Sequence, residues 1–149
     1  MKNLILATAV ALGFGALLSA HAEGPWLTDY KKAQEQAKSS NKLLLLEFTG
    51  SDWCPPCRML QREVLSTQEF QDYASKNFVL VELDFPRAKV QAPEIAEQNQ
   101  LLARRWGIQV FPSIIILDSA GKKIGELLGY DPGGGRAGYM ASLEKLRKG

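Results

Sequence analysis

One short apolar segment constrains the fold of this chain more than any other feature. Residues 43–48 read Leu-Leu-Leu-Leu-Glu-Phe, and only the glutamate interrupts the apolar run. A strand with one solvent-exposed face alternates apolar and polar residues, whereas a continuous apolar run of this length is typical of a strand that is buried on both faces. We therefore expect residues 43–48 to form a strand inside a sheet that carries helices on both of its faces.

The rest of the chain alternates between helical and extended patterns. Helical spacing of apolar residues and helix-boundary residues predict four helices, at 28–40, 54–73, 93–106 and 136–148. Short apolar runs predict four strands, at 43–48, 77–85, 113–117 and 122–128. Thr28 is expected to cap the first helix and Gly107 to close the third. Strands joined by helices pair in parallel, and the last two strands form a hairpin. We therefore predict an α/β fold with a mixed four-stranded sheet and helices on both faces.

The first 22 residues have the pattern of a secretory signal. Lys2 precedes an apolar run at 4–18, and Ala20-His21-Ala22 is a small-residue cleavage site. We predict cleavage after Ala22, which leaves residues 23–149 as one domain in the periplasm or otherwise exported, without stable membrane insertion. An uncleaved membrane anchor is the alternative, although the run is short for a hydrocarbon core of about 30 Å.

Composition argues against two classes of partner. The 18 basic and 16 acidic residues give a net charge of +2, which is too small to indicate binding to nucleic acid or to an anionic membrane surface. Cys54 and Cys57 are the two cysteines of the chain, and its one histidine, His21, lies inside the predicted signal. Zinc sites need three or four protein ligands, so we expect no metal. The cysteine pair is left for redox chemistry in an oxidising compartment.

The spacing of the two cysteines suits dithiol chemistry. Cys54 ends the loop after the apolar strand and begins a predicted helix, where free N–H groups and the positive end of the helix dipole favour a thiolate. Cys57 lies one helical turn further on, within reach of a mixed disulfide formed by Cys54. We predict Cys54 as the exposed nucleophile and Cys57 as the shielded resolving thiol. A passive structural disulfide is the alternative, and so small a ring contributes about 2 kcal/mol.

Three separated segments make residues 26–146 resemble the thioredoxin superfamily. Residues 53–57, Trp-Cys-Pro-Pro-Cys, match its redox motif, and residues 50–57 are similar to exported bacterial thioredoxin-like proteins. Residues 106–113, Trp-Gly-Ile-Gln-Val-Phe-Pro-Ser, resemble the segment that ends in the family's cis-proline, and Gly129 resembles the glycine of its substrate groove. The resemblance implies a thioredoxin fold with an extra N-terminal helix.

By this resemblance, the substrate-binding residues lie around the disulfide. Pro112 is expected to be cis and to face the disulfide, and Gly129 is expected to line the substrate groove. The backbone of Phe111 is then free to pair with an extended substrate segment as an added strand. Trp53 and Phe111 supply an apolar rim, and Trp106 either joins that rim or packs in the core.

Glu47 is the one acid in the apolar strand, where a carboxylate is costly unless it is paired or protonated. It matches the buried acid that helps to deprotonate the resolving thiol in thioredoxins, so the resemblance implies a proton shuttle whose pKa is raised by burial. A strand-end acid that reaches water is the alternative. The chain departs from the family in carrying Glu instead of Asp here and one extra loop residue before the cysteines. It also has Glu82 near a position where thioredoxins often carry Lys.

Together these features predict a thiol–disulfide oxidoreductase that acts on protein cysteines outside the cytoplasm, as a monomer and without a cofactor beyond its own cysteine pair. Pro55 and Pro56 remove two N–H donors near Cys54, so we expect a weakly stabilised thiolate and a reductant or isomerase-like role. A reductant in an oxidising compartment needs an electron donor, which we expect to be a membrane thiol relay. A disulfide oxidase and a non-catalytic binding or holdase module are the alternatives.

One further motif resembles a dinucleotide-binding pattern but lacks the context that such a site needs. Residues 133–138, Gly-Gly-Gly-Arg-Ala-Gly, match the pattern Gly-x-Gly-x-x-Gly and precede a predicted helix. A dinucleotide site also needs a strand–helix–strand unit, and no strand is predicted after this helix. We therefore interpret the segment as a flexible turn.

Overall fold

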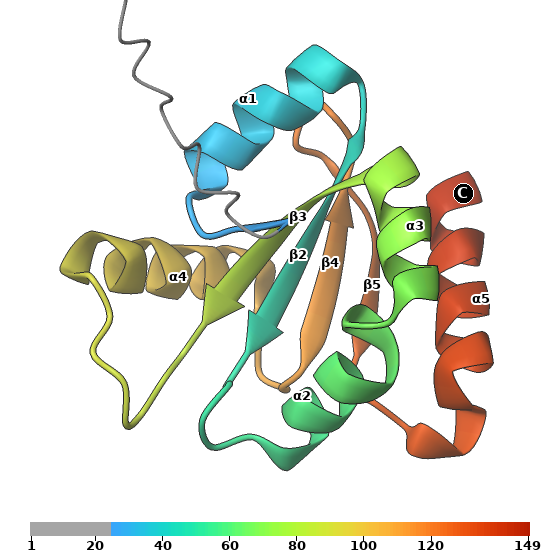
Figure 1. Ribbon diagram of the computed structural model, residues 1–149. Helices are drawn as coiled ribbons and strands as arrows, with labels where there is room; N and C mark the ends of the chain where they lie inside the picture. Colours follow the sequence, from blue (N-terminus) through green and yellow to red (C-terminus); the bar gives the residue numbers. More distant parts are fainter. Residues whose placement is uncertain (1–24) are drawn as a thin grey trace, which may run out of the picture.

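The computed structural model of the protein describes residues 25–149 (Figure 1). The predicted secretory signal at residues 1–22, its cleavage after Ala22 and the alternative of a membrane anchor lie outside the described residues and stay predictions. Within residues 25–149, no helix combines the length and the apolar character that crossing a membrane requires.

A five-stranded sheet forms the centre of the fold, in the order β1-β3-β2-β4-β5. β1, β3 and β2 run parallel, whereas the β2–β4 and β4–β5 pairs are antiparallel. The strands are β1 (Trp26–Leu27), β2 (Leu43–Thr49), β3 (Phe78–Asp84), β4 (Ser113–Leu117) and β5 (Lys123–Leu128).

The prediction of four strands is wrong, because it missed β1 at the edge of the sheet. Trp26 pairs with Leu80 and Leu27 pairs with Val81 in the parallel β1–β3 ladder. Two residues show no periodicity in a sequence, so only the neighbouring strand makes this segment a strand. The α/β class, the mixed sheet and the helices on both faces are confirmed.

Helices cover both faces of the sheet, and each face has its own hydrophobic core (Figure 1). On one face lie α1 (Tyr30–Ser40) and α4 (Pro93–Trp106). On the other lie α2 (Pro55–Leu60), α3 (Gln68–Asn77) and α5 (Gly135–Lys148). The redox motif therefore belongs to the layer of α2, α3 and α5.

β2 contributes side chains to both cores, as its apolar run predicts. Leu44, Leu46 and Phe48 point into the core beneath α1 and α4, whereas Leu45 points into the core beneath α2, α3 and α5. All four side chains are fully buried. Because β2 also pairs with β3 on one edge and β4 on the other, the loop that follows it starts from a rigid point.

Most of the other predicted boundaries hold to within one residue. α4 and β4 have the predicted bounds, and Gly107 closes α4 in the left-handed conformation, with φ of 64°. The bounds of β2, β3, β5 and α5 differ from the prediction by a single residue at one or both ends.

The helix predicted over residues 54–73 is wrong as a single element. α2 ends at Leu60 and widens into the π-helical turn η1 (Gln61–Leu65), and α3 begins only at Gln68. Thr67 caps α3, since its Oγ1 accepts the Phe70 N–H at 3.3 Å. Apolar side chains continue across the break, so the periodicity of the sequence did not reveal the new helix start.

α1 begins two residues later than predicted, and Asp29 rather than Thr28 caps it. A carboxylate oxygen of Asp29 accepts the Lys32 N–H at 3.0 Å. The Thr28 carbonyl instead accepts a hydrogen bond from Gln98 Nε2 of α4, at 2.9 Å. Asp and Thr are both good helix caps, so the sequence alone does not show which of the two caps α1. The contact of Thr28 with the distant helix α4 is visible only in the folded structure.

Replacing Asp29 with Ala removes the acceptor of the Lys32 N–H, so we expect the free energy of unfolding to fall by about 1 kcal/mol. Thr28→Ala is the matched control, because it shortens the neighbouring side chain and should change the free energy by less than about 0.5 kcal/mol. Urea unfolding of both variants and the wild type measures the difference. Equal losses in the two variants would contradict the assignment of Asp29 as the cap.

Candidate active site

Cys54 lies at the point where the loop after β2 enters α2. Its N–H donates to the Gly50 carbonyl at 2.9 Å, which closes the turn that follows the strand. Cys54 is the N-cap of α2, and its sulfur accepts the Cys57 N–H at 3.3 Å. The two sulfurs form a disulfide. The predicted placement of the pair, one turn apart at the start of a helix, is confirmed.

The Cys57 N–H is the first N–H group that α2 can offer to this sulfur. Pro55 and Pro56 fill the first two helical positions, and proline has no N–H. A thiolate at Cys54 therefore meets one first-turn N–H donor where most sequences would present three.

Both sulfurs are covered in this oxidised state. Cys54 is 3% exposed and Cys57 is 1% exposed. The predicted contrast between an exposed nucleophile and a shielded partner is therefore wrong for the disulfide form, in which the bond to Cys57 holds the Cys54 sulfur against the start of α2. Their roles as nucleophile and resolving thiol stay predictions.

Trp53 is held in one position beside the disulfide. Its indole N–H donates to the Phe85 carbonyl at 2.7 Å, and its ring meets the Phe111 ring edge-on with the centroids 5.6 Å apart. The Arg87 guanidinium lies 3.9 Å from the centroid of the indole ring. Gly50 makes this position available, because a Cβ there would lie 2.4 Å from the ring. The structure thus brings together the two residues predicted to form the apolar rim.

Sequence analysis missed two residues that fix the active-site loop, Ser51 and Asp52. Ser51 donates to the Asp84 carboxylate through its N–H at 2.9 Å and its Oγ at 2.6 Å. The Asp52 carboxylate accepts backbone N–H groups of residues 87–89 at 2.7 to 3.1 Å, and these donors lower the Asp52 pKa. Ser and Asp in a loop do indicate bonding to backbone, but their partners here lie more than 30 residues away.

The predicted substrate-binding segment has the expected backbone. The Phe111–Pro112 peptide bond is cis, and the Pro112 carbonyl accepts the Gly129 N–H at 2.7 Å. Among residues 25–149, no hydrogen bond uses the backbone of Phe111, which leaves that backbone available to a bound strand. Trp106 packs against the core beneath α1 and α4, which favours the packing interpretation of this residue.

Glu47 is buried, with 1% of its surface exposed. Burial, together with the neighbouring carboxylates of Glu82 and Asp84, raises the pKa of Glu47 to about 8. Among the residues that the structure describes, none forms a hydrogen bond with its Oε2. The alternative of a strand-end acid that reaches water is wrong, because β2 continues to Thr49 and this face of the sheet is covered by helices.

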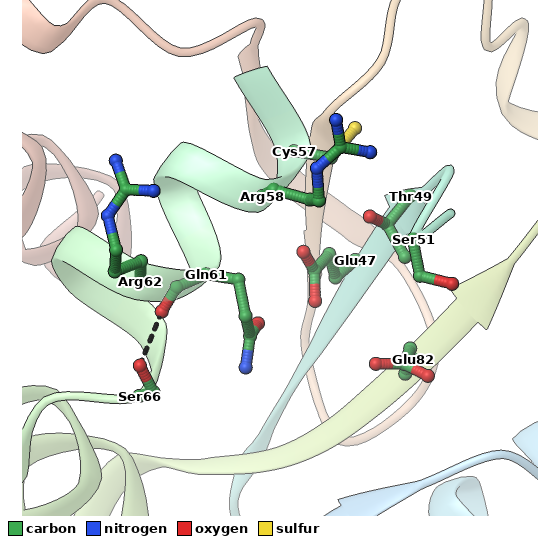
Figure 2. A pocket seen from close by; sticks show the side chains of 9 residues that line it. All are labelled: Glu47, Thr49, Ser51, Cys57, Arg58, Gln61, Arg62, Ser66 and Glu82. Atoms are coloured by element: carbon green, nitrogen blue, oxygen red, sulfur yellow. Dashed lines mark hydrogen bonds between the residues drawn. The ribbon is translucent and has the colours of Figure 1, made fainter. Parts of the chain in front are cut away.

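Glu47 and Cys57 line the same cavity, whose volume is about 320 Å³ (Figure 2). Figure 2 shows the Glu47 carboxyl between Cys57 on α2 and Glu82 on β3. Polar side chains line this cavity, and a space of this size has room for water, which a proton path between an acid and a thiol needs. The role of Glu47 as a proton shuttle stays a prediction.

A family model described as a thioredoxin-like domain matches residues 30–135, which include the disulfide, Glu47 and the cis-proline. The chain belongs to the thioredoxin-like family. Thioredoxin-like proteins work through their cysteine disulfide and use no further cofactor. Within residues 25–149, no group of three or more His, Cys, Asp or Glu side chains is arranged to hold a metal ion.

This thioredoxin-like chain is 35% identical over 119 residues to "Disulfide bond reductase DsbH" of Chlamydia pneumoniae, an alignment that covers 80% of this chain and 70% of that protein. A solved structure of a DsbH oxidoreductase shares 34% identity, 83% coverage of both chains and a TM-score of 0.76. "Thioredoxin-related protein DsbJ" of the same organism is 33% identical over 99 residues, which are 66% of this chain and 28% of that protein. With its Cys54–Cys57 disulfide, this thioredoxin-like chain is a thiol–disulfide oxidoreductase.

The buried Glu47 should make the oxidised protein less stable as the pH rises. Its pKa in the folded protein is about 8. An unfolded glutamate has a pKa of about 4.3, so between these two values the folded state holds a proton that the unfolded state has lost. Stability should therefore fall by up to ~1.4 kcal/mol per pH unit across that window, and Glu47→Gln should flatten the slope.

Urea unfolding without reductant, at pH values from about 5 to about 9, measures this slope while the disulfide keeps the thiols from titrating. The matched control is Glu35→Gln, which removes the same charge from an exposed position on α1 and should keep the wild-type slope. A wild-type protein whose stability falls no faster than that of Glu47→Gln would contradict the raised pKa.

Proposed function

We propose that this enzyme is a disulfide reductase for protein substrates outside the cytoplasm. The observation that carries the proposal is the sparse support of the Cys54 sulfur, which accepts one first-turn N–H because prolines occupy the two positions before Cys57. Strongly oxidising members of this fold hold a well-stabilised thiolate in their reduced form. A dithiol with a poorly stabilised thiolate gives up its electrons more readily.

Two further features support the same direction of electron flow. The cavity beneath Cys57 contains the carboxyl groups of Glu47 and Glu82, and negative charge disfavours a nearby thiolate. The one histidine of the chain is His21, so none of residues 25–149 can place an imidazolium beside the pair. A relative that covers most of this chain carries the name of a disulfide bond reductase.

The reaction follows from the geometry of the pair. The Cys54 thiolate attacks a substrate disulfide and forms a mixed disulfide, and one substrate sulfur leaves as a thiolate. Cys57 then loses its proton and attacks Cys54, which forms the Cys54–Cys57 bond and releases the second substrate sulfur. The substrate gains two electrons and the enzyme dithiol is oxidised. An isomerase-like reaction uses the first step and lets a substrate thiol take the place of Cys57.

The Trp53 and Phe111 rings, cis-Pro112 and Gly129 form the surface on which we expect an extended substrate segment to lie, paired with the backbone of Phe111. The predicted signal at residues 1–22 supports an exported, periplasmic enzyme. Since that compartment is oxidising, the enzyme needs a thiol donor, for which we propose a membrane dithiol relay. We propose that the enzyme acts as a monomer.

The reduction potential tests the direction of electron flow. We expect equilibration with glutathione redox buffers to give a value closer to the about −270 mV of thioredoxin than to the about −120 mV of a strong oxidant. Replacing Pro55 and Pro56 with Ala should raise the potential, because it restores two N–H donors near Cys54. A wild-type value above about −150 mV would identify an oxidase instead.

Substitution of each cysteine separates an enzyme from a binding module. Cys54→Ser should abolish reduction of insulin disulfides, because the attacking thiolate is gone. Cys57→Ser should accumulate substrate proteins bound through Cys54 in cells, because the resolving thiol is gone, and their identification gives the substrate class. The double Ser variant is the control for non-covalent capture. A Cys54→Ser protein that retains insulin reduction, or alkylation of both reduced thiols at equal, peptide-like rates, would contradict the assigned roles.

A further inference from the structure

Glu82 is a second acid at the redox site, and it has no role in the reaction proposed above. Glu47 and Glu82 are register partners in the parallel β2–β3 ladder, so their side chains leave the sheet side by side on the same face. Both line the cavity that also contains Cys57, and Figure 2 shows their carboxyl groups within it. Glu82 is half-buried, whereas Glu47 is closed off from solvent.

Within the described part of the chain, no cation forms an ion pair with either acid. Arg58 of α2 and Arg62 of η1 line the same cavity, but among residues 25–149 neither forms an ion pair with Glu47 or Glu82. Arg62 pairs instead with Glu63 at 2.9 Å. When two carboxyl groups lie side by side without an ion-pairing cation, the charge of the first raises the free energy needed to ionise the second. Such pairs therefore tend to retain one proton.

The other charged and titratable groups near the pair include one that strengthens this effect, one that leaves it unchanged and one that opposes it. Asp84 at the end of β3 adds a like charge that acts on both acids. Tyr139 of α5 faces Glu47 as a neutral phenol, because burial raises its pKa. Lys89, in the loop after β3, is the cation that acts on Glu82 and lowers its pKa, but burial and Asp84 raise the Glu82 pKa and outweigh it. The β4 partner of Glu47 is the apolar Ile114.

We infer that Glu47 and Glu82 act as one acid pair that carries a single proton, with Glu82 as the positioning residue that sets when Glu47 can accept the proton of Cys57. The inference rests on the proposed proton transfer from Cys57 but not on the direction of electron flow. In that step the Cys57 thiol gives its proton to the Glu47 carboxylate. The Cys57 thiolate attacks Cys54, their disulfide forms, and the bond from Cys54 to the substrate sulfur breaks.

The pair sets the pH at which Glu47 becomes a base. Burial by itself favours the protonated form of Glu47, and the like charge of Glu82 adds to this effect. While the pair carries one proton, Glu47 is therefore the protonated partner and Glu82 the ionised one. When that proton leaves through water in the cavity, a carboxylate at Glu47 becomes available to the Cys57 thiol. Glu82 reaches the solvent side, so the pair can exchange its proton with water after each turnover.

The test follows the resolving step with 5,5′-dithiobis(2-nitrobenzoate) as substrate. The reduced enzyme releases one thionitrobenzoate when Cys54 attacks and a second when Cys57 resolves the mixed disulfide, and stopped-flow absorbance separates the two phases. The rate of the second phase should rise with pH through a midpoint set by the acid pair and the Cys57 thiol. Glu82→Gln removes the like charge, so we expect the midpoint of the second phase to move down by on the order of one pH unit.

Three further variants keep the result specific. Glu82→Asp retains a carboxylate and should keep the midpoint near its wild-type value. Glu35→Gln, an equal charge change on the exposed side of α1, should leave it unchanged. In a Glu47→Gln background, Glu82→Gln should produce no further shift, because Glu82 acts through Glu47.

Each outcome decides a separate question. A midpoint that Glu82→Gln leaves in place, or a shift that persists when Glu47 is Gln, would overturn the acid pair and leave the oxidoreductase intact. Loss of the second phase in the wild type would instead overturn the role of Cys57 as resolving thiol. Titration of the glutamate carboxyl groups by ¹³C NMR in the oxidised protein is an independent measurement, and two uncoupled single-step curves would also overturn the pair.

Discussion

The burial of β2 on both faces is the constraint on which the rest of the structure depends. Its leucines pack into two separate cores. A shift of the strand by one residue would move every side chain to the opposite face and so disrupt both cores. That rigidity fixes the point at which the loop to Cys54 leaves the sheet. It also keeps Glu47 in a position from which its carboxyl cannot reach bulk solvent, because the same register that buries Leu45 places Glu47 beneath the layer of α2.

The redox loop is anchored to a second strand end as well. β2 and β3 are parallel, so their carboxyl ends lie at the same edge of the sheet, where binding sites of α/β proteins commonly form. Ser51 binds Asp84, Asp52 binds the backbone of residues 87–89, and Trp53 binds the Phe85 carbonyl. Three consecutive loop residues thus contact the last residue of β3 or the segment that follows it, and Cys54 enters α2 from a loop with little freedom to move.

The two sulfurs face different electrostatic surroundings within this frame. Cys54 lies at a helix start from which proline has removed two of the usual N–H donors. Cys57 lies above a cavity lined by two carboxyl groups, neither of which forms an ion pair with a residue between 25 and 149. Neither environment favours a persistent thiolate, and both suit a dithiol that ionises only when a proton acceptor is ready. The same carboxyl groups destabilise the folded protein when they ionise, so the chemistry of the site opposes its stability.

The sequence by itself determined what depends on residues close together along the chain. The apolar run at 43–48 required a strand covered on both faces, Gly107 ended α4, and the Cys-Pro-Pro-Cys motif set the start of α2. A resemblance carried by residues 106–113 pointed to the cis bond before Pro112. Only the tertiary structure decided β1, the partners of Ser51 and Asp52, and the pairing of Glu47 with Glu82. Each of these joins segments that are distant in the chain. Such contacts arise from the packing of the folded protein, because local periodicity and turn chemistry do not indicate which distant segment will lie beside a given residue.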